Sequence, residues 1–156
     1  MTGEFKISVL ASGSKGNATV ISAGGKNFLI DAGISCRQLV QRLKEAGMTP
    51  EDLDAILLTH EHRDHINGLP VFSRKYHLPV FANEATWRYL PQRGEMERAC
   101  CRLLPKSLET EGLKITSFNV PHDAANAVGY AFSYAGARCV YLTDVGFITG
   151  EKKNKM

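Results

Sequence analysis

The sequence is organised around short apolar runs that each end in a residue able to bind a metal ion. Four such runs, read as β-strands, lead into Asp31, His60, His122 and Asp144. If these strands lie in stacked sheets, their ends meet at one edge, where a rigid scaffold holds the side chains in place. The sequence therefore predicts layered sheets whose polar strand ends converge on one site.

Between these runs, strand patterns alternate with helix patterns. The first three strands, at 6–10, 18–22 and 27–31, are predicted to form a β-meander. A capping box of Ser35 and Gln38, with Gly47 beyond the far end, predicts a helix over about 35–46. The later elements are expected as a helical turn at 49–52, strands at 54–59 and 78–82, helices at 68–77 and after Asn83, and strands at 113–120, 129–135 and 138–143. Residues 91–98 give no clear element, and the whole pattern indicates a single α/β (α+β) domain over 1–156.

Composition limits the classes of protein that this sequence can represent. With 156 residues, 44% of them apolar, the chain is long enough for one compact domain. Its net charge of +3 is compatible with an anionic substrate but does not by itself imply nucleic acid. No apolar stretch approaches the roughly 20 residues of a membrane span, so no membrane partner is expected. Four cysteines without a C-x-x-C pair suit reduced thiols and a cytoplasmic protein.

The segment HEHRDH, residues 60–65, concentrates metal-binding side chains. In an extended chain His60 and His62 project to the same side, as two imidazole ligands of one ion require. Asp64 and His65 are adjacent and are expected to point in different directions, so we assign them to a second ion nearby. A surface loop with coincidental histidines is the alternative, and the complete H-x-H-x-D-H pattern after a strand favours metal.

These residues carry a resemblance to a known family. The stretch THEHRDHINGL resembles the signature loop of the metallo-β-lactamase superfamily, and LIDAG, PHDAANAVGYAF and YLTDVG follow that family's order of motifs. Together with the loop SGSKGN, they look most like the YycJ/VicX/WalJ-type branch, over about residues 6–148. The resemblance implies an αββα sandwich with a metal site at the sheet edge, and a metal-dependent DNA exonuclease.

The resemblance also implies roles for the residues. His60, His62 and His122 would bind a first metal, Asp64 and His65 a second, and Asp144 would bridge them. Two divalent ions, zinc by default for histidine-rich ligation or manganese as the alternative, would lower the pKa of a shared water and hold it as hydroxide. Catalysis is expected to depend on Asp64.

Two further groups surround these ligands. Asp31 is expected to accept a hydrogen bond from a ligand histidine and to fix its orientation, or else to serve as a strand-end turn. In the loop at 12–17, Ser14, Lys15 and Asn17 are candidate substrate contacts, because backbone N–H groups and hydroxyls near a positive charge can cradle a phosphate. A plain β-turn between two strands is the alternative for this loop.

One departure from the family pattern affects the expected activity. Superfamily members continue to a last histidine, whereas here twelve residues follow Asp144 and no histidine follows His122. The sandwich is therefore expected to be incomplete at its C-terminus, with the second metal held weakly. A phosphodiesterase acting on DNA is the preferred function. A hydrolase of another ester, thioester or lactam and a catalytically inactive fragment are the alternatives.

Overall fold

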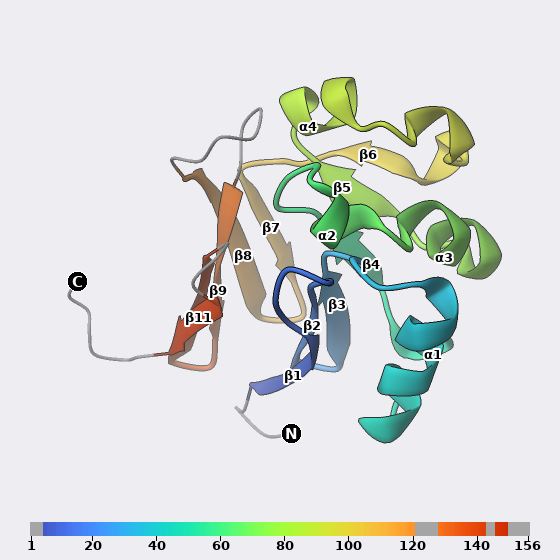
Figure 1. Ribbon diagram of the computed structural model, residues 1–156. Coiled ribbons are helices and arrows are strands. Elements are labelled where there is room, and N and C mark those ends of the chain that lie inside the picture. The colour runs from blue at the N-terminus through green and yellow to red at the C-terminus, as the bar shows by residue number, and fades with distance from the viewer. Residues whose placement is uncertain (1–4, 121–127, 143–145, 150–156) are drawn as a thin grey trace.

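Two β-sheets pack face to face, and helices cover the outer side of one of them, in the computed structural model (Figure 1). The structure describes residues 5–120, 128–142 and 146–149. Six strands form the first sheet, in the order β1 (Lys6–Ala11), β2 (Ala18–Ala23), β3 (Lys26–Ile30), β4 (Ala55–Leu57), β5 (Val80–Ala82) and β6 (Cys101–Leu103). Five strands form the second sheet, in the order β11 (Gly146–Thr149), β10 (Ala137–Leu142), β9 (Val128–Tyr134), β8 (Leu113–Asn119) and β7 (Ser107–Thr110).

The helices belong to the crossovers of the first sheet. They are α1 (Cys36–Glu45), α2 (Arg63–Ile66), α3 (Leu69–Tyr76) and α4 (Glu84–Tyr89), with short 3-10 turns at η1 (Pro50–Asp52), η2 (Arg93–Glu95) and η3 (Arg98–Cys100). Strands β1 to β3 pair antiparallel, whereas β3 to β6 pair parallel, as helical crossovers require. Because β3 and β4 run in the same direction, the loops that follow them leave the sheet at one edge.

Local signals account for the first crossover helix. Ser35 Oγ accepts a hydrogen bond from the Gln38 backbone N–H, and Gln38 Oε1 accepts one from the Ser35 N–H, each at 3.2 Å. This reciprocal pair satisfies two backbone donors at the start of α1. Leu39 and Leu43 lie on one face of the helix and are fully buried. The predicted helix, its cap and the β-meander before it are therefore confirmed.

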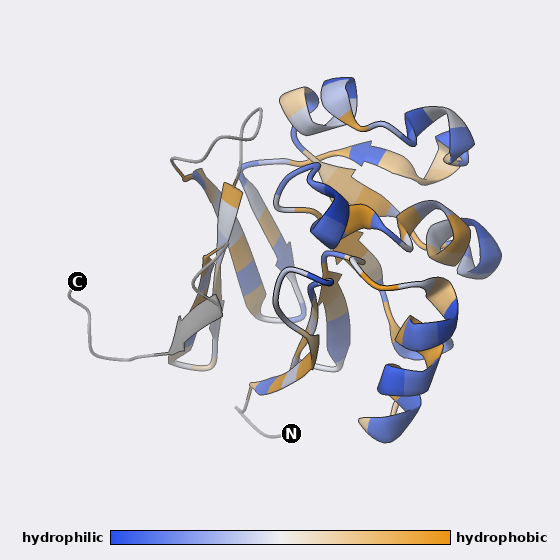
Figure 2. Cartoon of the chain, in the orientation of Figure 1, coloured by the Kyte–Doolittle hydropathy of each residue, from blue (hydrophilic) through white to orange (hydrophobic). Residues whose placement is uncertain are grey.

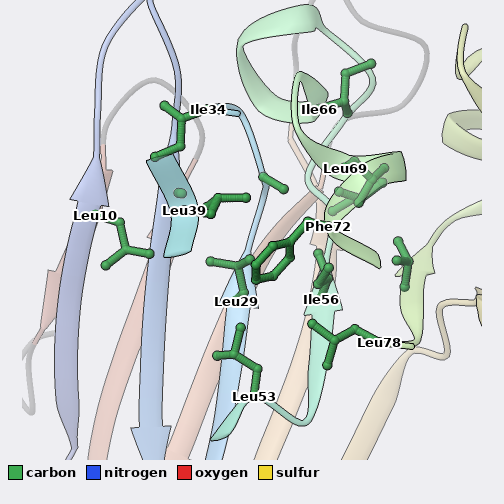
Figure 3. Packing of buried hydrophobic residues seen from close by; sticks show 14 of the residues in the cluster. Leu10, Leu29, Ile34, Leu39, Leu53, Ile56, Ile66, Leu69, Phe72 and Leu78 are labelled. Carbon is green, nitrogen blue, oxygen red and sulfur yellow. The ribbon is translucent and has the colours of Figure 1, made fainter. Parts of the chain in front are cut away.

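Alternation along the strands divides the core into two layers. In β4, Ile56 faces the helices, and its neighbours Ala55 and Leu57 face the second sheet. The helix-side cluster packs around Phe72 and Leu39 (Figure 3). The cluster between the sheets joins strands of both, including Leu57 and Tyr130. Strands β4 and β5 are accordingly hydrophobic along their length, whereas the outer sides of the helices are polar (Figure 2).

The described residues form three layers of the expected αββα sandwich. Helices, first sheet and second sheet follow one another (Figure 1), and within residues 5–120, 128–142 and 146–149 no helix covers the outer face of the second sheet. No helix of the described residues is both long and apolar enough to cross a membrane. All four cysteines are free thiols. Cys139 lies in the core between the sheets, where burial raises its pKa to about 12.

The sequence pattern did not predict strands β6, β7 and β11, helix α2, or the short turns η2 and η3. Strands β6 and β7 are short, carry exposed residues, and show no alternation that separates them from a loop. Helix α2 has only four residues and lies inside the HEHRDH segment, which was expected to be extended. In each case the surrounding structure decides the local conformation, because so short a segment has little propensity of its own.

The core makes a direct prediction about stability. Phe72→Ala should lower the free energy of unfolding by about 3–5 kcal/mol, because it leaves a cavity in the helix-side core. Val71→Ala is the matched control, since Val71 lies on the same helix with 47% of its surface exposed, whereas Phe72 is 0% exposed. Urea denaturation of both variants measures the difference. Equal midpoints would contradict this description of α3.

Candidate metal centre

The candidate centre lies where the second sheet meets the ends of β3 and β4. Asp31 follows β3, and residues 58–60 follow β4. From β9, the Tyr130 hydroxyl donates to the Leu58 carbonyl at 2.6 Å and the Val128 N–H donates to the Thr59 carbonyl at 2.9 Å. Burial raises the pKa of the Tyr130 phenol well above its ordinary value, and the negative charge of Asp31 adds to the effect. The hydroxyl therefore stays a donor that ties the two sheets together.

Asp31 is a fully buried acceptor for three hydrogen bonds. Its Oδ1 accepts from the Thr59 N–H at 2.8 Å, and its Oδ2 accepts from the Thr59 hydroxyl at 2.7 Å. The same Oδ2 lies 2.5 Å from His65 Nδ1. A carboxylate inside a protein requires such donors, because desolvation otherwise makes the charge very costly. Asp31 also has a positive φ of 65°, at the point where the chain leaves β3.

These contacts fix the protonation pattern of two histidines. The Thr59 hydroxyl has one hydrogen, which it donates to Asp31, so its oxygen accepts from His60 Nδ1 at 2.9 Å. His65 Nδ1 likewise carries the proton that faces Asp31. In a neutral ring with its proton on Nδ1, the lone pair belongs to Nε2, and this is the form in which imidazole binds a cation. Sequence reasoning missed Thr59, whose place directly before His60 in the motif is the one signal that could have identified it.

The rings of the three motif histidines gather in one place. His60 and His62 have ring centroids 4.6 Å apart, and His60 and His65 have centroids 4.1 Å apart. Asp64 Oδ2 lies 3.5 Å from His65 Nε2. The expectation that Asp64 and His65 point in different directions is therefore wrong, because these residues lie in α2, where neighbours differ by about 100° rather than by the 180° of a strand.

One pair of donor atoms has a spacing that suits two ligands of a divalent cation. Neighbouring ligand atoms of a tetrahedral zinc site with bonds of about 2.1 Å lie about 3.4 Å apart, and Asp64 Oδ2 and His65 Nε2 are separated by 3.5 Å. Within the described part of the chain, no group of three His, Cys, Asp or Glu side chains forms a complete metal site. His122 and Asp144, the other two expected ligands, lie outside the described residues.

The loop at 12–17 lies against the HEHRDH segment through Asn17. Its side-chain Nδ2 is 2.9 Å from the Gly13 carbonyl and 3.1 Å from Asp64 Oδ2, and its backbone N–H donates to the Asp64 carbonyl at 2.7 Å. Asn17, expected to contact substrate, is thus bonded to Asp64 across 47 residues of sequence. Ser14 and Lys15 are exposed at the same loop. The structure therefore brings all three candidate substrate contacts beside Asp64.

A glycine makes this close approach possible. The Gly33 N–H donates to the Asn17 carbonyl at 2.9 Å, and a Cβ on Gly33 would lie 1.9 Å from the Asp64 carbonyl oxygen and 2.5 Å from the Asn17 nitrogen. Both obstacles are backbone atoms, which cannot move aside like the end of a side chain. Three segments of backbone therefore pack together at the candidate centre, and no side chain fits between them.

Gly33→Ala should consequently destabilise the protein by at least about 1–3 kcal/mol, the usual cost of overpacking. Gly94→Ala is the matched control, because a Cβ on Gly94 meets no atom within 4 Å and its φ is not positive. That variant should change the free energy of unfolding by less than about 0.5 kcal/mol. Thermal and urea unfolding measure both, and a Gly33→Ala protein of normal stability would show that the three segments do not pack so closely.

Asp31→Asn tests the buried acceptor. Asparagine tolerates a positive φ, so the backbone turn is preserved, but its amide places a donor against the donors of Thr59 or His65. We expect a loss of about 1–3 kcal/mol of unfolding free energy. Asp54→Asn is the control, because Asp54 is exposed and the asparagine oxygen still accepts from the Asn27 N–H. Equal urea midpoints for the two variants would rule out the acceptor role of Asp31.

Sequence relatives agree with this architecture. Residues 26–156 match the family described as the beta-lactamase superfamily domain. Exodeoxyribonuclease WalJ of Streptococcus pneumoniae is 39% identical over 150 residues, which cover 93% of this chain and 56% of that protein. Exodeoxyribonuclease YycJ of Bacillus anthracis is also 39% identical, over 149 residues that cover 94% of this chain and 56% of that protein. The chain therefore spans little more than half the length of these two relatives.

Solved structures share the fold at low sequence identity. A metallo-β-lactamase of Cronobacter sakazakii with a HARLDQ motif superposes with a TM-score of 0.70 at 17% identity, over 86% of this chain and 60% of that one. MEM-A1, a subclass B3 metallo-β-lactamase from a soil metagenome library, gives a TM-score of 0.66 at 23% identity, over 88% and 58% of the two chains. The family match, the two stacked sheets and the histidine-rich loop at their edge agree. The chain belongs to the beta-lactamase superfamily and has the metallo-β-lactamase fold.

Proposed function

We propose that this protein is a metal-dependent phosphodiesterase that acts on DNA as an exonuclease. The observation that carries the metal-dependent part is the hydrogen-bond chain from His60 through Thr59 to Asp31, which also receives His65. The names of the two relatives, both exodeoxyribonucleases, support the DNA part. The superfamily implies divalent metal ions, and we propose zinc, with manganese as the alternative because oxygen ligands are also present.

The proposed ligands are those that the sequence motif supplies. His60, His62 and His122 would hold one ion and Asp64 and His65 a second, with Asp144 between them. A bound divalent cation lowers the pKa of a coordinated water and offsets the negative charge that develops on an attacked phosphate. Asp31 fixes the ring orientation of His65, and Thr59 does the same for His60. Asp64 is the proposed catalytic residue, because its carboxylate shares the centre with His65.

A measurement of metal content tests whether the proposed site binds metal, and it requires no knowledge of the substrate. Protein purified without chelators should contain bound metal by elemental analysis, and His60→Ala should lose most of it. His77→Ala is the matched control, because His77 is an exposed residue at the end of α3 and lies outside the motif. If both variants kept the same metal content as the parent protein, the motif would not bind metal.

Hydrolysis tests the reaction. An aryl phosphodiester and linear DNA should be cleaved, and Asp64→Asn should reduce the rate by more than about 100-fold, since changes to groups that merely orient ligands already cost about 10–100-fold. Asp54→Asn, the same change before β4, at the strand end opposite the motif, should retain the parent rate. A thioester and a cephalosporin are the comparison substrates. Turnover of these two without turnover of the phosphodiester would exclude the nuclease assignment.

A further inference from the structure

A small hollow lies beside Asp64, and its lining includes positively charged side chains that are not among the proposed metal ligands. It has a volume of about 200 Å³ and is lined by Ser14, Lys15, Gly33, Arg63, Asp64 and Asn67. Pockets for drug-sized ligands measure about 300–1,000 Å³. The hollow is therefore suited to a single chemical group of a substrate rather than to a whole nucleotide.

Most side chains that line the hollow can donate hydrogen bonds to a bound group. Lys15, from the loop at 12–17, and Arg63, from the start of α2, supply two positive charges, and both side chains are exposed. Among the residues that the structure describes, neither takes part in an ion pair. Ser14 adds a hydroxyl and Asn67 an amide. Ammonium and guanidinium groups that converge with neutral donors bind a multivalent oxyanion, for which a phosphate group is the biological example.

The lining contains one carboxylate, Asp64, and its Oδ2 oxygen is engaged outside the hollow. Asp64 Oδ2 accepts from Asn17 Nδ2 at 3.1 Å and lies 3.5 Å from His65 Nε2. Asp64 is therefore held towards the candidate metal centre, and it marks the boundary between that centre and the hollow. A group bound between Lys15 and Arg63 would lie directly beside the atoms proposed to carry out hydrolysis.

The shape of the hollow is built into the backbone. The Gly13 N–H donates to Asn17 Oδ1 at 3.2 Å, and Asn17 Nδ2 donates back to the Gly13 carbonyl at 2.9 Å, so the loop that carries Ser14 and Lys15 is closed on itself. Gly33 also lines the hollow, and its missing side chain lets the backbones of Asn17 and Asp64 approach each other. Such preorganisation lowers the entropic cost of binding a ligand group.

We propose that this hollow is a phosphate-binding subsite in which Lys15 and Arg63 hold a backbone phosphate of the nucleic-acid substrate next to the metal centre. The proposal rests on the proposed function for the nature of the substrate. It adds Arg63, which the ligand motif leaves without a role, and it gives Lys15 a defined partner. Asn17 becomes the positioning residue of the subsite through its bonds to Gly13 and Asp64.

The first experiment measures binding of inorganic phosphate by titration calorimetry, using protein as purified with its metal content determined in parallel. Lys15→Gln and Arg63→Gln should each weaken phosphate binding about tenfold, because each removes a charge-assisted contact. The matched controls are Lys75→Gln and Arg37→Gln, the same two changes in a separate hollow between α1 and α3. Thermal melting of all four variants checks that they are folded.

The second experiment measures binding of a short phosphorothioate oligothymidylate, which resists cleavage, by fluorescence anisotropy over a range of salt concentrations. The slope of log K against log salt is negative, and its magnitude should decrease by about 0.7 in Lys15→Gln and by the same amount in Arg63→Gln. This is the value for one lost phosphate contact on a single strand. Arg37→Gln and Lys75→Gln should keep the parent slope.

The outcomes separate the subsite from the proposed function. Phosphate binding that is equally strong in all four variants would overturn the subsite, even if the protein cleaves DNA. Phosphate binding that requires Lys15 and Arg63, in a protein with no affinity for the oligonucleotide, would support the subsite and overturn nucleic acid as the substrate. The complete proposal is supported if Lys15→Gln and Arg63→Gln weaken binding of both phosphate and the oligonucleotide while the two control variants bind like the parent protein.

Discussion

The buried carboxylate of Asp31 is the interaction on which the candidate centre depends. A fully buried charge is stable only when donors surround it, and Thr59 and His65 supply three. In satisfying Asp31, these donors orient the two histidine rings at the start and end of the HEHRDH segment. One electrostatic requirement of folding thereby orients the imidazole rings of His60 and His65, so the candidate centre is formed by the same contacts that keep the end of β3 stable.

Close packing of the backbone also fixes the position of the loop at 12–17 relative to the candidate centre. Gly33 lies between Asn17 and Asp64, and each of the three segments bonds to another through its main chain. The loop that carries Lys15 is therefore placed relative to Asp64 by backbone contacts, to which the side chain of Asn17 adds further hydrogen bonds. Sites held in this manner keep their geometry more exactly than sites on isolated loops. The second sheet adds a further constraint through Tyr130, whose hydroxyl bonds to Leu58 next to the motif.

Much of the first sheet and its helices could be predicted, because the signals are local. The capping box of Ser35 and Gln38, the apolar pair Leu39 and Leu43, and the alternation in the first strands each act within a few residues. Strands β6 and β7 could not be predicted, because they are short and are defined mainly by pairing with β5 and β8. The orientation of Asp64 and His65 was mispredicted, since the sequence gives no sign that an isolated four-residue helix forms there.

By itself the sequence determined the chemistry: imidazole and carboxylate ligands in a characteristic spacing, the strands that precede them, and a resemblance to one superfamily. Only the tertiary structure decided which atoms meet. Asp31 and His65, 34 residues apart, come together because the parallel strands β3 and β4 end at the same edge of the sheet. Asn17 and Asp64, 47 residues apart, meet at this edge because the antiparallel strand β2 begins beside the end of β3. The hollow between Lys15 and Arg63 arises in the same way. Periodicity and capping act over one or two turns of chain, whereas a site assembled from several loops depends on strand order, which packing of the whole domain selects.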